Sequence, residues 1–347
     1  MIRIGIVGAG ENTRTRHIPG LRAQRDVEIV GVVNRTPPST ARVAATFSIP
    51  RQFNRWEELV ADPQIDAVVI GTWPDLHAPV TCAALAAGKH VLTEARMARN
   101  LAEARQMHAA AQAHPNQVAM IVPSPFGLIC GPRIDELLYR NYIGDLRELV
   151  VIGADDQFHD YSRPLHWRQD AEKSGLNVLS LGILHETALR WSSPPVRVFA
   201  QTHTFEPTRP NPDGPGQLPV TVPDSVQVVT QLANGGRGLY HFSGVALFGP
   251  GKQIHLYGSS GTIKVEFLPG GVERVSVGRV SDAALHEIDI PPEQRGRWRV
   301  EEAFVRAIRG EEPVKLTTFD VGLAYMQFTE AVARSAATGQ AVDLPLG

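Results

Sequence analysis

Short apolar runs alternate with alanine-rich amphipathic stretches through the first 123 residues, and this alternation restricts the possible folds more than any other feature. The runs are rich in valine and isoleucine, as strands buried on both faces of a sheet must be, and lie at Ile2–Val7, Val27–Val33, Ala67–Ile70, His90–Leu92 and Val118–Val122. Helices are predicted between them, for example at Ala78–Ala87 and Leu101–Ala113. Asn100 can cap the latter, with Glu103 as its capping-box partner. Such alternation predicts an α/β fold with a doubly wound parallel sheet.

The pattern changes after Pro123-Ser124-Pro125. Residues 196–300 consist mainly of strand-like runs separated by glycine-rich turns, which predicts a large, open, mostly antiparallel sheet in an α+β domain. The other elements predicted here are a helix at Ile134–Arg140, a strand at 146–152 and helices near 299–309 and 318–337. The segment Pro207–Pro223 contains six prolines and is predicted to be an exposed loop. The chain of 347 residues therefore divides into two domains, 1–123 and 124–347.

The composition excludes several classes of protein. Lys and Arg number 34 and Asp and Glu number 36, so a net charge of −2 argues against a nucleic-acid or anionic-membrane partner. No targeting signal and no run of about 18 apolar residues occurs. The two cysteines, Cys82 and Cys130, provide no disulfide framework. His166, His185 and His203 have no metal-ligand spacing with a cysteine or carboxylate. We expect a cytoplasmic protein without a metal site.

The first strand runs directly into Gly8-Ala9-Gly10, and a helical segment follows. A glycine turn at this place lets backbone N–H groups approach a pyrophosphate, whose charge the helix dipole stabilises. Thr13 stands in place of the third glycine of the usual G-x-G-x-x-G pattern. We predict a cofactor site that includes Gly8, Gly10, Glu11, Asn12 and Thr13, with a plain strand–helix turn as the alternative.

The residue that contacts the adenosine ribose is expected at the end of the second strand, about 20 residues further on. That place holds Asn34-Arg35-Thr36 instead of an acidic residue, so the 2′-hydroxyl of NAD(H) loses its usual partner. The guanidinium of Arg35 could instead pair with a 2′-phosphate. Asn34 and Arg35 therefore predict that NADP(H) is preferred and NAD(H) is possible, and an exposed loop arginine without this role is the alternative.

Further motifs follow in a fixed order: His17-Ile18-Pro19, Thr72-Trp73-Pro74-Asp75-Leu76-His77 and Ala87-Gly88-Lys89-His90-Val91-Leu92-Thr93-Glu94. Together with Gly8-Ala9-Gly10, Tyr142-Ile143-Gly144-Asp145 and the tail Leu316–Pro345, they resemble the Gfo/Idh/MocA oxidoreductases, the relatives of glucose–fructose oxidoreductase and inositol dehydrogenase. The resemblance covers the whole chain.

This resemblance implies a Rossmann dinucleotide-binding domain at 1–123 and a substrate-binding and oligomerisation domain at 124–347. It implies hydride transfer to or from a ring hydroxyl or ketone of a sugar, inositol or related polyol. It also implies a homodimer or homotetramer that forms through the C-terminal sheet. The resemblance also implies further cofactor-binding residues, namely Thr72, Trp73, Pro74, His77 and Glu94.

The chain departs from the family's Glu-Lys-Pro motif, whose lysine lies by the nicotinamide and the reacting hydroxyl. Glu94 is followed by Ala95 and Arg96, and alanine can neither donate a proton nor form a charge-assisted hydrogen bond. Arg96 could replace the charge of the lysine but not its proton, because a guanidinium does not deprotonate near neutral pH. Arg96 is thus a candidate catalytic residue, with a surface or ion-pairing role as the alternative.

A second departure lies in the family's D-x-G-x-H-x-x-D motif. Aligned through Gly182, its first carboxylate, histidine and last carboxylate are replaced by Ser180, Leu184 and Thr187. His185 is displaced by one residue, about 100° around a helix. It is nevertheless a candidate acid/base residue, since histidine most often has that role near neutral pH, and a structural histidine is the alternative.

Other polar and aromatic residues surround this segment. Asn177 is a candidate catalytic residue that would orient the substrate, and Trp167, Arg168 and Glu186 are candidate substrate contacts. Plain packing is the alternative for Trp167, and local capping or pairing is the alternative for Glu186.

Three hypotheses for the function stay open at this point. The first is an NAD(P)-dependent dehydrogenase or reductase with non-standard acid/base residues. The second is an enzyme that retains its cofactor and catalyses elimination or hydrolysis of a glycoside, since oxidation of a ring hydroxyl acidifies the neighbouring C–H. The third is a catalytically silent nucleotide-binding or scaffold protein, which the missing lysine and histidine favour.

Overall fold

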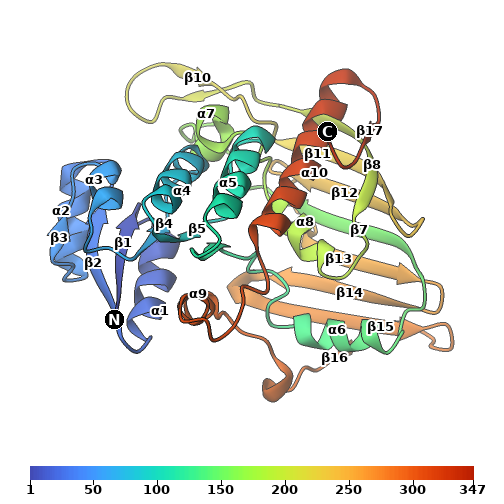
Figure 1. Cartoon of the computed structure of the whole chain (residues 1–347). Coiled ribbons are helices and arrows are strands. Elements are labelled where there is room, and N and C mark those ends of the chain that lie inside the picture. Colours follow the sequence, from blue (N-terminus) through green and yellow to red (C-terminus); the bar gives the residue numbers. More distant parts are fainter. The chain divides into compact units, whose positions relative to one another are not determined.

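The computed structural model describes residues 1–347, and the chain folds into two compact units (Figure 1). Unit 1 comprises residues 1–123 and 299–326, and unit 2 comprises residues 124–298 and 327–347. The sequence-based division placed 299–326 in the second domain, whereas in the structure this segment packs with the first. The reason is long-range: Glu301 pairs with His17, and the Tyr325 hydroxyl accepts a hydrogen bond from the backbone N–H of Met97.

Unit 1 contains a parallel sheet of six strands in the order β3-β2-β1-β4-β5-β6. The strands are β1 (Ile2–Val7), β2 (Val27–Val33), β3 (Arg51–Gln52), β4 (Ala67–Ile70), β5 (His90–Thr93) and β6 (Ala119–Ile121). The predicted doubly wound sheet is confirmed, and the five predicted strands agree with the observed ones to within one residue at each end. The sixth strand, β3, has two residues, which is too short for an apolar pattern.

The helices of unit 1 are α1 (Ile18–Arg22), α2 (Pro37–Thr46), α3 (Trp56–Ala61), α4 (His77–Ala86), α5 (Leu101–Ala113), α9 (Val300–Ile308) and the part of α10 (Phe319–Thr338) up to residue 326. Asn100 caps α5 as predicted, because its side chain accepts the Glu103 N–H at 3.0 Å. The Glu103 carboxylate, however, accepts hydrogen bonds from the backbone and the guanidinium of Arg99. A charge-assisted pair thus replaces the predicted capping-box contact with Asn100.

Unit 2 contains a sheet of nine strands in the order β16-β15-β14-β13-β7-β12-β11-β8-β17. Neighbouring strands are antiparallel except β7 and β12, so the prediction of a mostly antiparallel sheet is confirmed. The strands are β7 (Leu146–Ala154), β8 (Pro195–His203), β11 (Ser225–Leu232), β12 (Arg237–Ser243), β13 (Gly251–Gly258), β14 (Gly261–Leu268), β15 (Val272–Arg279), β16 (His286–Ile288) and β17 (Val342–Asp343).

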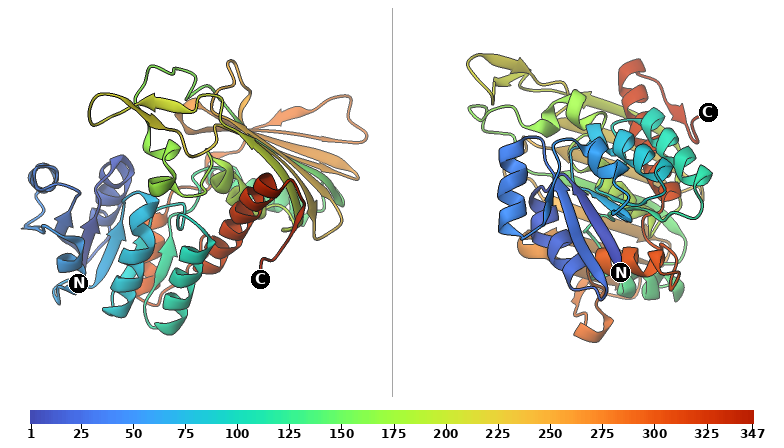
Figure 2. Two further views of the ribbon diagram at one scale, coloured as in Figure 1. Left: turned by 90° about the horizontal axis from the view of Figure 1, so that it is seen from above. Right: turned by 60° about the vertical axis from the view of Figure 1, so that its left-hand side comes forward.

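The helices of unit 2 are α6 (Gly131–Tyr139), α7 (Ala171–Ser174), α8 (Leu181–Leu189) and the part of α10 (Phe319–Thr338) that follows residue 326. α8 and this part of α10 lie on one face of the sheet (Figure 2). Their apolar residues share one buried core with every second residue of the strands, for example Val226 and Val228 of β11. Alternate burial along the strands leaves the opposite face uncovered within the unit.

The segment Pro207–Pro223 differs from the exposed loop that we predicted. β9 (Thr208–Pro210) and β10 (Gln217–Pro219) pair as an antiparallel hairpin, and residues 212–216 at its tip are exposed. Pro210 and Pro219 are accommodated because they end the two strands, where a ladder N–H is not required. Pro212 and Pro215 lie in the tip. Arg209 is buried, and its guanidinium donates hydrogen bonds to the carbonyls of Phe158 and Asp160. These hydrogen bonds compensate for the loss of solvent around the charge.

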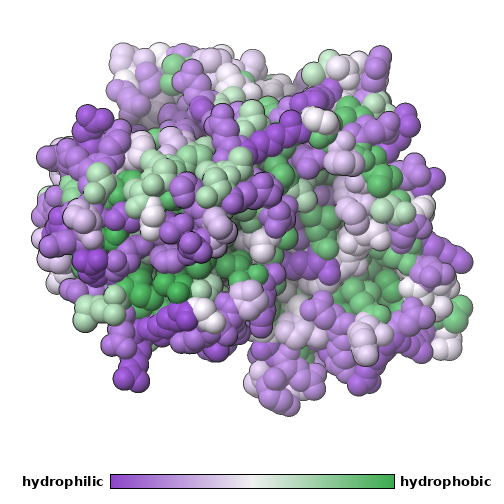
Figure 3. All heavy atoms as spheres, in the orientation of Figure 1, coloured by the Kyte–Doolittle hydropathy of each residue, from purple (hydrophilic) through white to green (hydrophobic).

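Figure 3 shows one face of the chain coloured by hydropathy. Hydrophilic residues cover most of this face, and smaller hydrophobic patches lie among them. None of the helices is both long and apolar enough to cross a bilayer.

Candidate functional site

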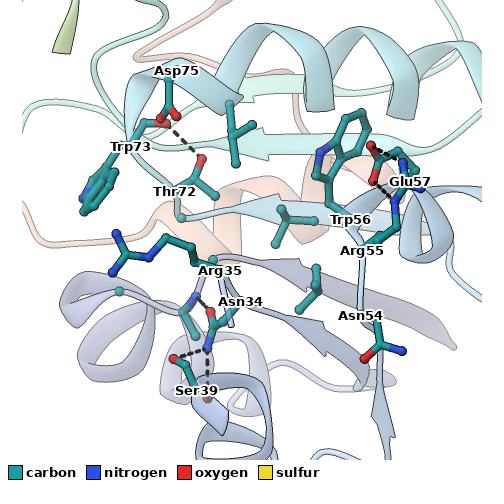
Figure 4. A pocket seen from close by; sticks show the side chains of 17 residues that line it. Asn34, Arg35, Ser39, Asn54, Arg55, Trp56, Glu57, Thr72, Trp73 and Asp75 are labelled. Carbon is teal, nitrogen blue, oxygen red and sulfur yellow. Dashed lines mark hydrogen bonds and ion pairs between the residues drawn. The ribbon is translucent and has the colours of Figure 1, made fainter. Parts of the chain in front are cut away.

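A cavity of about 530 Å³ lies in unit 1 where β1, β2 and β4 end (Figure 4). In a sheet of this order, the strand order reverses between β1 and β4, and a crevice forms at the carboxyl ends of the strands there. Four segments line the cavity: Val7–Gly10, then Val33, Asn34, Arg35 and Ser39, then Asn54–Glu57, and lastly Gly71, Thr72, Trp73, Asp75 and Leu76.

The glycine loop packs closely against the end of β4. Gly8 has a φ of +82°, and a Cβ there would lie 2.6 Å from Cγ2 of Thr72. A Cβ on Gly71, at the end of β4, would lie 2.4 Å from the Gly8 carbonyl oxygen. The loop therefore keeps its shape only with glycine at these positions, and that shape fits the close backbone approach that a pyrophosphate needs.

Thr13 occupies the position of the missing third glycine. The residues Thr13–His17 form a π-helical turn, and its first residue points inward with 1% of its surface exposed. The Thr13 hydroxyl donates a hydrogen bond to the Gly8 carbonyl at 3.2 Å. The side chain at the third position thus joins the π-helical turn to the start of the glycine loop.

The end of β2 holds the two residues that the sequence predicted for the ribose. The Asn34 side chain accepts the Ala9 N–H at 2.7 Å and donates to the carbonyl of Ser39 at 3.2 Å, so it fixes the glycine loop to α2. Arg35 is exposed at the edge of the cavity, and its guanidinium lies 5.3 Å from the ring of Trp73 (Figure 4). A cation beside an aromatic ring is held by the ring quadrupole.

Sequence reasoning missed part of the lining. Asn54 and Arg55 lie between β3 and α3, and Trp56 and Glu57 begin α3. Arg55 pairs with Glu57 at 3.1 Å. These four residues follow β3, which has only two residues and therefore gives no strand pattern in the sequence. Without β3, nothing in the sequence places them at this edge of the sheet. Asp75 also lines the cavity, and burial raises the pKa of its carboxyl.

Six of the predicted cofactor residues do not line the cavity: Glu11, Asn12, Thr13, Pro74, His77 and Glu94. Glu11 is exposed and Pro74 is buried. The ring nitrogens of His77 lie 2.8 Å from the Arg96 carbonyl and 3.1 Å from the Thr72 carbonyl, and burial lowers the pKa of the ring. His77 therefore joins two loops of the site, and the part of all these residues in cofactor binding stays a prediction.

Arg96 follows Ala95 in the segment after β5. It is 3% exposed, which does not fit the surface role that we considered for it. Ala95 offers no group for acid/base chemistry. Arg96 thus supplies a buried fixed positive charge one residue after the place where the resemblance implies a lysine.

His185 lies in the hydrophobic core of unit 2. Its ring stacks on Phe328 with the centroids 3.7 Å apart, and its Nδ1 lies 3.0 Å from the Tyr240 hydroxyl. Burial lowers the pKa of His185 to about 3, so the ring is neutral near pH 7. These surroundings favour the structural histidine over the acid/base residue.

The three family positions on this segment, Ser180, Leu184 and Thr187, carry no titratable group. Leu184 belongs to the core, and the Thr187 hydroxyl donates to the Ser124 hydroxyl at 2.8 Å. Glu186 is 2% exposed, accepts the Ser124 N–H at 2.8 Å and pairs with Arg190 at 2.7 Å. The local pairing that we considered for Glu186 is therefore what the structure contains.

The remaining candidates of unit 2 differ in exposure. Asn177 is 1% exposed and donates to the Ser174 carbonyl at 2.6 Å. Trp167 and Arg168 are partly exposed in a short 3₁₀ turn, and the guanidinium lies 4.1 Å from the indole ring. Trp167 and Arg168 can therefore offer an aromatic face and a cation together, whereas Asn177 is engaged inside the unit.

Comparisons with protein families match both units. Residues 2–122 match a family model described as "Oxidoreductase family, NAD-binding Rossmann fold", and residues 133–264 match one described as "GFO/IDH/MocA C-terminal domain". Among similar proteins, 1,5-anhydro-D-fructose reductase of Ensifer adhaerens is 27% identical over 100% of both chains. Trans-1,2-dihydrobenzene-1,2-diol dehydrogenase of Mus musculus is 33% identical over 52% of this chain and 53% of its own length.

Solved structures resemble the whole chain. A levoglucosan dehydrogenase in complex with NADH and L-sorbose has a TM-score of 0.87 at 22% identity, with 99% of each chain covered. An oxidoreductase domain protein from Kribbella flavida has a TM-score of 0.86 at 21% identity, again with 99% of each chain covered. At these identities the likeness establishes the shared fold.

Proposed function

The chain belongs to the Gfo/Idh/MocA family of oxidoreductases, and from that premise we propose that it transfers hydride to or from a ring hydroxyl or ketone of a sugar, inositol or related polyol, with NAD(P) as cofactor. The observation that carries this proposal is the cavity at the switch point of the sheet, bordered by the Gly8–Gly10 loop. The names of two similar proteins, an anhydrofructose reductase and a levoglucosan dehydrogenase, support a carbohydrate substrate.

NADP(H) is the preferred cofactor in this proposal, and NAD(H) is a possible one. The Gly8–Gly10 loop would hold the pyrophosphate, and Arg35 with Ser39 would hold a 2′-phosphate at the adenosine ribose. No acidic side chain stands at the end of β2 to bind a free 2′-hydroxyl. A nicotinamide dinucleotide, when bound, supplies or accepts the hydride.

The acid/base chemistry of this proposal is non-standard. Arg96 would stabilise the negative charge that develops on the substrate oxygen, since a fixed buried cation acts without exchanging a proton. Trp167 and Arg168 would contact the substrate, the indole through its face and the guanidinium through hydrogen bonds. His185, Asn177 and Glu186 have no part in it, because their surroundings engage them within unit 2.

A catalytically silent nucleotide-binding protein is the second candidate. Ala95 in place of the lysine and the burial of His185 beside Phe328 favour it, because neither position offers a proton donor. Under this reading the cavity binds a dinucleotide without turnover.

Activity assays separate the two candidates. We expect the wild-type protein to change NADPH absorbance with members of a sugar and polyol panel, and Arg96→Ala to lower kcat about 100-fold with little change in KM. Arg99→Ala is the matched control, because it removes a neighbouring arginine that pairs with Glu103. Product formed without net change of the cofactor would instead support retained-cofactor elimination or hydrolysis. Wild type without any product, with activity appearing in Ala95→Lys, would support the silent protein.

The uncovered face of the nine-stranded sheet supports assembly of two copies. Phe199 (45% exposed), Val229 (50%) and Leu239 (48%) lie side by side in register on β8, β11 and β12. The neighbouring row on the same face contains both charge signs, with Arg197, Arg237 and Glu148. An apolar row with both charge signs beside it suits contact between identical faces. In this proposal the protein is a homodimer, or a homotetramer that contains this dimer.

A charge in the apolar row tests this assembly. We expect Val229→Lys to convert the wild-type dimer or tetramer into smaller species, since a desolvated lysine without a partner opposes burial of the row. Light scattering coupled to size-exclusion chromatography measures the mass. Val280→Lys, in an exposed turn beyond β15, is the control and should leave the mass unchanged. A monomeric wild type at tens of micromolar protein would exclude this interface.

A further inference from the structure

His17 lies buried between two carboxylates of unit 1. Its Nε2 is 3.0 Å from Oε1 of Glu94, which follows β5, and its Nδ1 is 2.5 Å from Oε1 of Glu301 on α9. The imidazole is 0% exposed, and the side chains of Glu94 and Glu301 are 16% and 4% exposed. Gly20 permits this approach, because a Cβ there would lie 2.6 Å from Oε2 of Glu301.

This arrangement requires a charged ring. A neutral imidazole has one N–H and one lone pair, so it can donate to only one of the two carboxylates and would repel the other. Burial opposes the charge, but the hydrogen bonds to Glu301 and Glu94 outweigh it and raise the pKa of His17 to about 9. The pKa of Glu94 is lowered in turn, although burial opposes this. His77, the next titratable group near Glu94, has a pKa lowered by burial and is neutral.

Glu94 also connects this pair to the glycine loop. Its carboxylate accepts a hydrogen bond from the side chain of Asn12, two residues after Gly10. Its backbone N–H donates to the Ile70 carbonyl at 2.9 Å, next to Gly71 in the wall of the cavity. A continuous series of contacts thus runs from α9 through His17 and Glu94 to the turn that carries the loop.

We propose that His17 is a positioning residue of the nucleotide site: as an imidazolium it ties Glu94 to Glu301 and so holds Asn12 and the Gly8–Gly10 loop in the shape that accepts a pyrophosphate. The inference rests on the proposed dinucleotide function of the cavity. Loss of the proton leaves two carboxylates around one N–H, and the loop then moves away from the binding shape. Dinucleotide affinity therefore depends on the protonation of His17.

The test compares the affinity for NADPH from pH 7 to pH 10 in wild type, Glu301→Gln and Glu302→Gln. We expect wild-type affinity to fall about tenfold with a midpoint near pH 9, and the midpoint of Glu301→Gln to lie about one pH unit lower, since one of the two carboxylates is neutral. Glu302→Gln is the matched control on α9, because Glu302 pairs with Arg299 instead, and its profile should follow wild type. NMR of the imidazole carbons follows the titration of His17 itself.

Two results overturn this proposal alone, and a third overturns the proposed function as well. A wild-type affinity that is constant over this range while NMR reports His17 titrating would leave the ring a structural role only. A midpoint that does not move in Glu301→Gln would have the same consequence. If neither NADPH nor NADH binds at pH 7, the proposed function fails as well, and the NMR titration then describes a charge cluster without a ligand site.

Discussion

Replacing Arg35 by alanine is expected to lower the affinity for NADPH about 10- to 100-fold and to leave the affinity for NADH nearly unchanged. The guanidinium lies at the edge of the cavity beside the Trp73 ring, where a 2′-phosphate would meet it. A charge-assisted hydrogen bond of this kind contributes about 1.5–3 kcal/mol, which corresponds to this range. Titration of tryptophan fluorescence measures both affinities, since Trp73 and Trp56 line the cavity.

Arg55→Ala separates a specific contact from general electrostatics. Arg55 lines the same cavity and carries the same charge, but it pairs with Glu57 and lies on the segment before α3 (Figure 4). Its removal should lower the affinities for both dinucleotides by a similar, small factor. An unchanged NADPH preference in Arg35→Ala, or an equal loss in the two variants, would contradict recognition of a 2′-phosphate by Arg35.

The second large effect concerns stability against pH. We expect the free energy of unfolding to fall by roughly 3 kcal/mol as pH rises from about 6.5 to 9, because the pKa of His17 is about 9 in the folded protein. Below pH 6.5 the ring is protonated in both states and its stabilisation is complete. Between these values the unfolded chain loses the proton while the folded chain keeps it, so raising the pH favours unfolding. Above pH 9 the contribution is lost.

Urea unfolding at several pH values between 6 and 10 measures this slope. His17→Gln should abolish the slope in this window, and His159→Gln, at an exposed loop position, should retain it. The other buried histidines, His77 and His185, do not contribute there, because burial lowers the pKa of both rings, in His185 to about 3, and their linkage lies at lower pH. A wild-type stability that is constant from pH 6.5 to 9 would exclude a charged His17 between Glu94 and Glu301.

The strands of unit 1 were predictable because their signal is local. A strand buried on both faces must be apolar along its length, so Val27–Val33 and Ala67–Ile70 were identified with the observed bounds. The α5 cap at Asn100 follows from one side chain and a nearby N–H in the same way. β3 escaped detection because two residues carry no periodicity. The hairpin within Pro207–Pro223 escaped detection because prolines at strand ends resemble prolines in a loop.

The residues of the candidate site were predictable only where they directly follow a strand that the sequence itself identifies. The Gly8–Gly10 loop and Arg35 follow the first and second strands of a parallel sheet, whose carboxyl ends meet at one edge, and both line the cavity. Asn54–Glu57 line the same cavity, but nothing in the local sequence places them at that edge. Their position depends on how β3 pairs with β2.

The sequence by itself determined the parallel sheet, the mostly antiparallel sheet, the glycine loop at the end of β1 and the oxidoreductase family. Only the tertiary structure decided what the histidines do. His17 ends a π-helical turn and His185 lies in α8, yet one lies between the carboxylates of Glu94 and Glu301 and the other against the ring of Phe328. The partners of His17 are 77 and 284 residues away in the chain. The charge of a buried imidazole is set by the groups that surround it in space, and local sequence does not specify those groups.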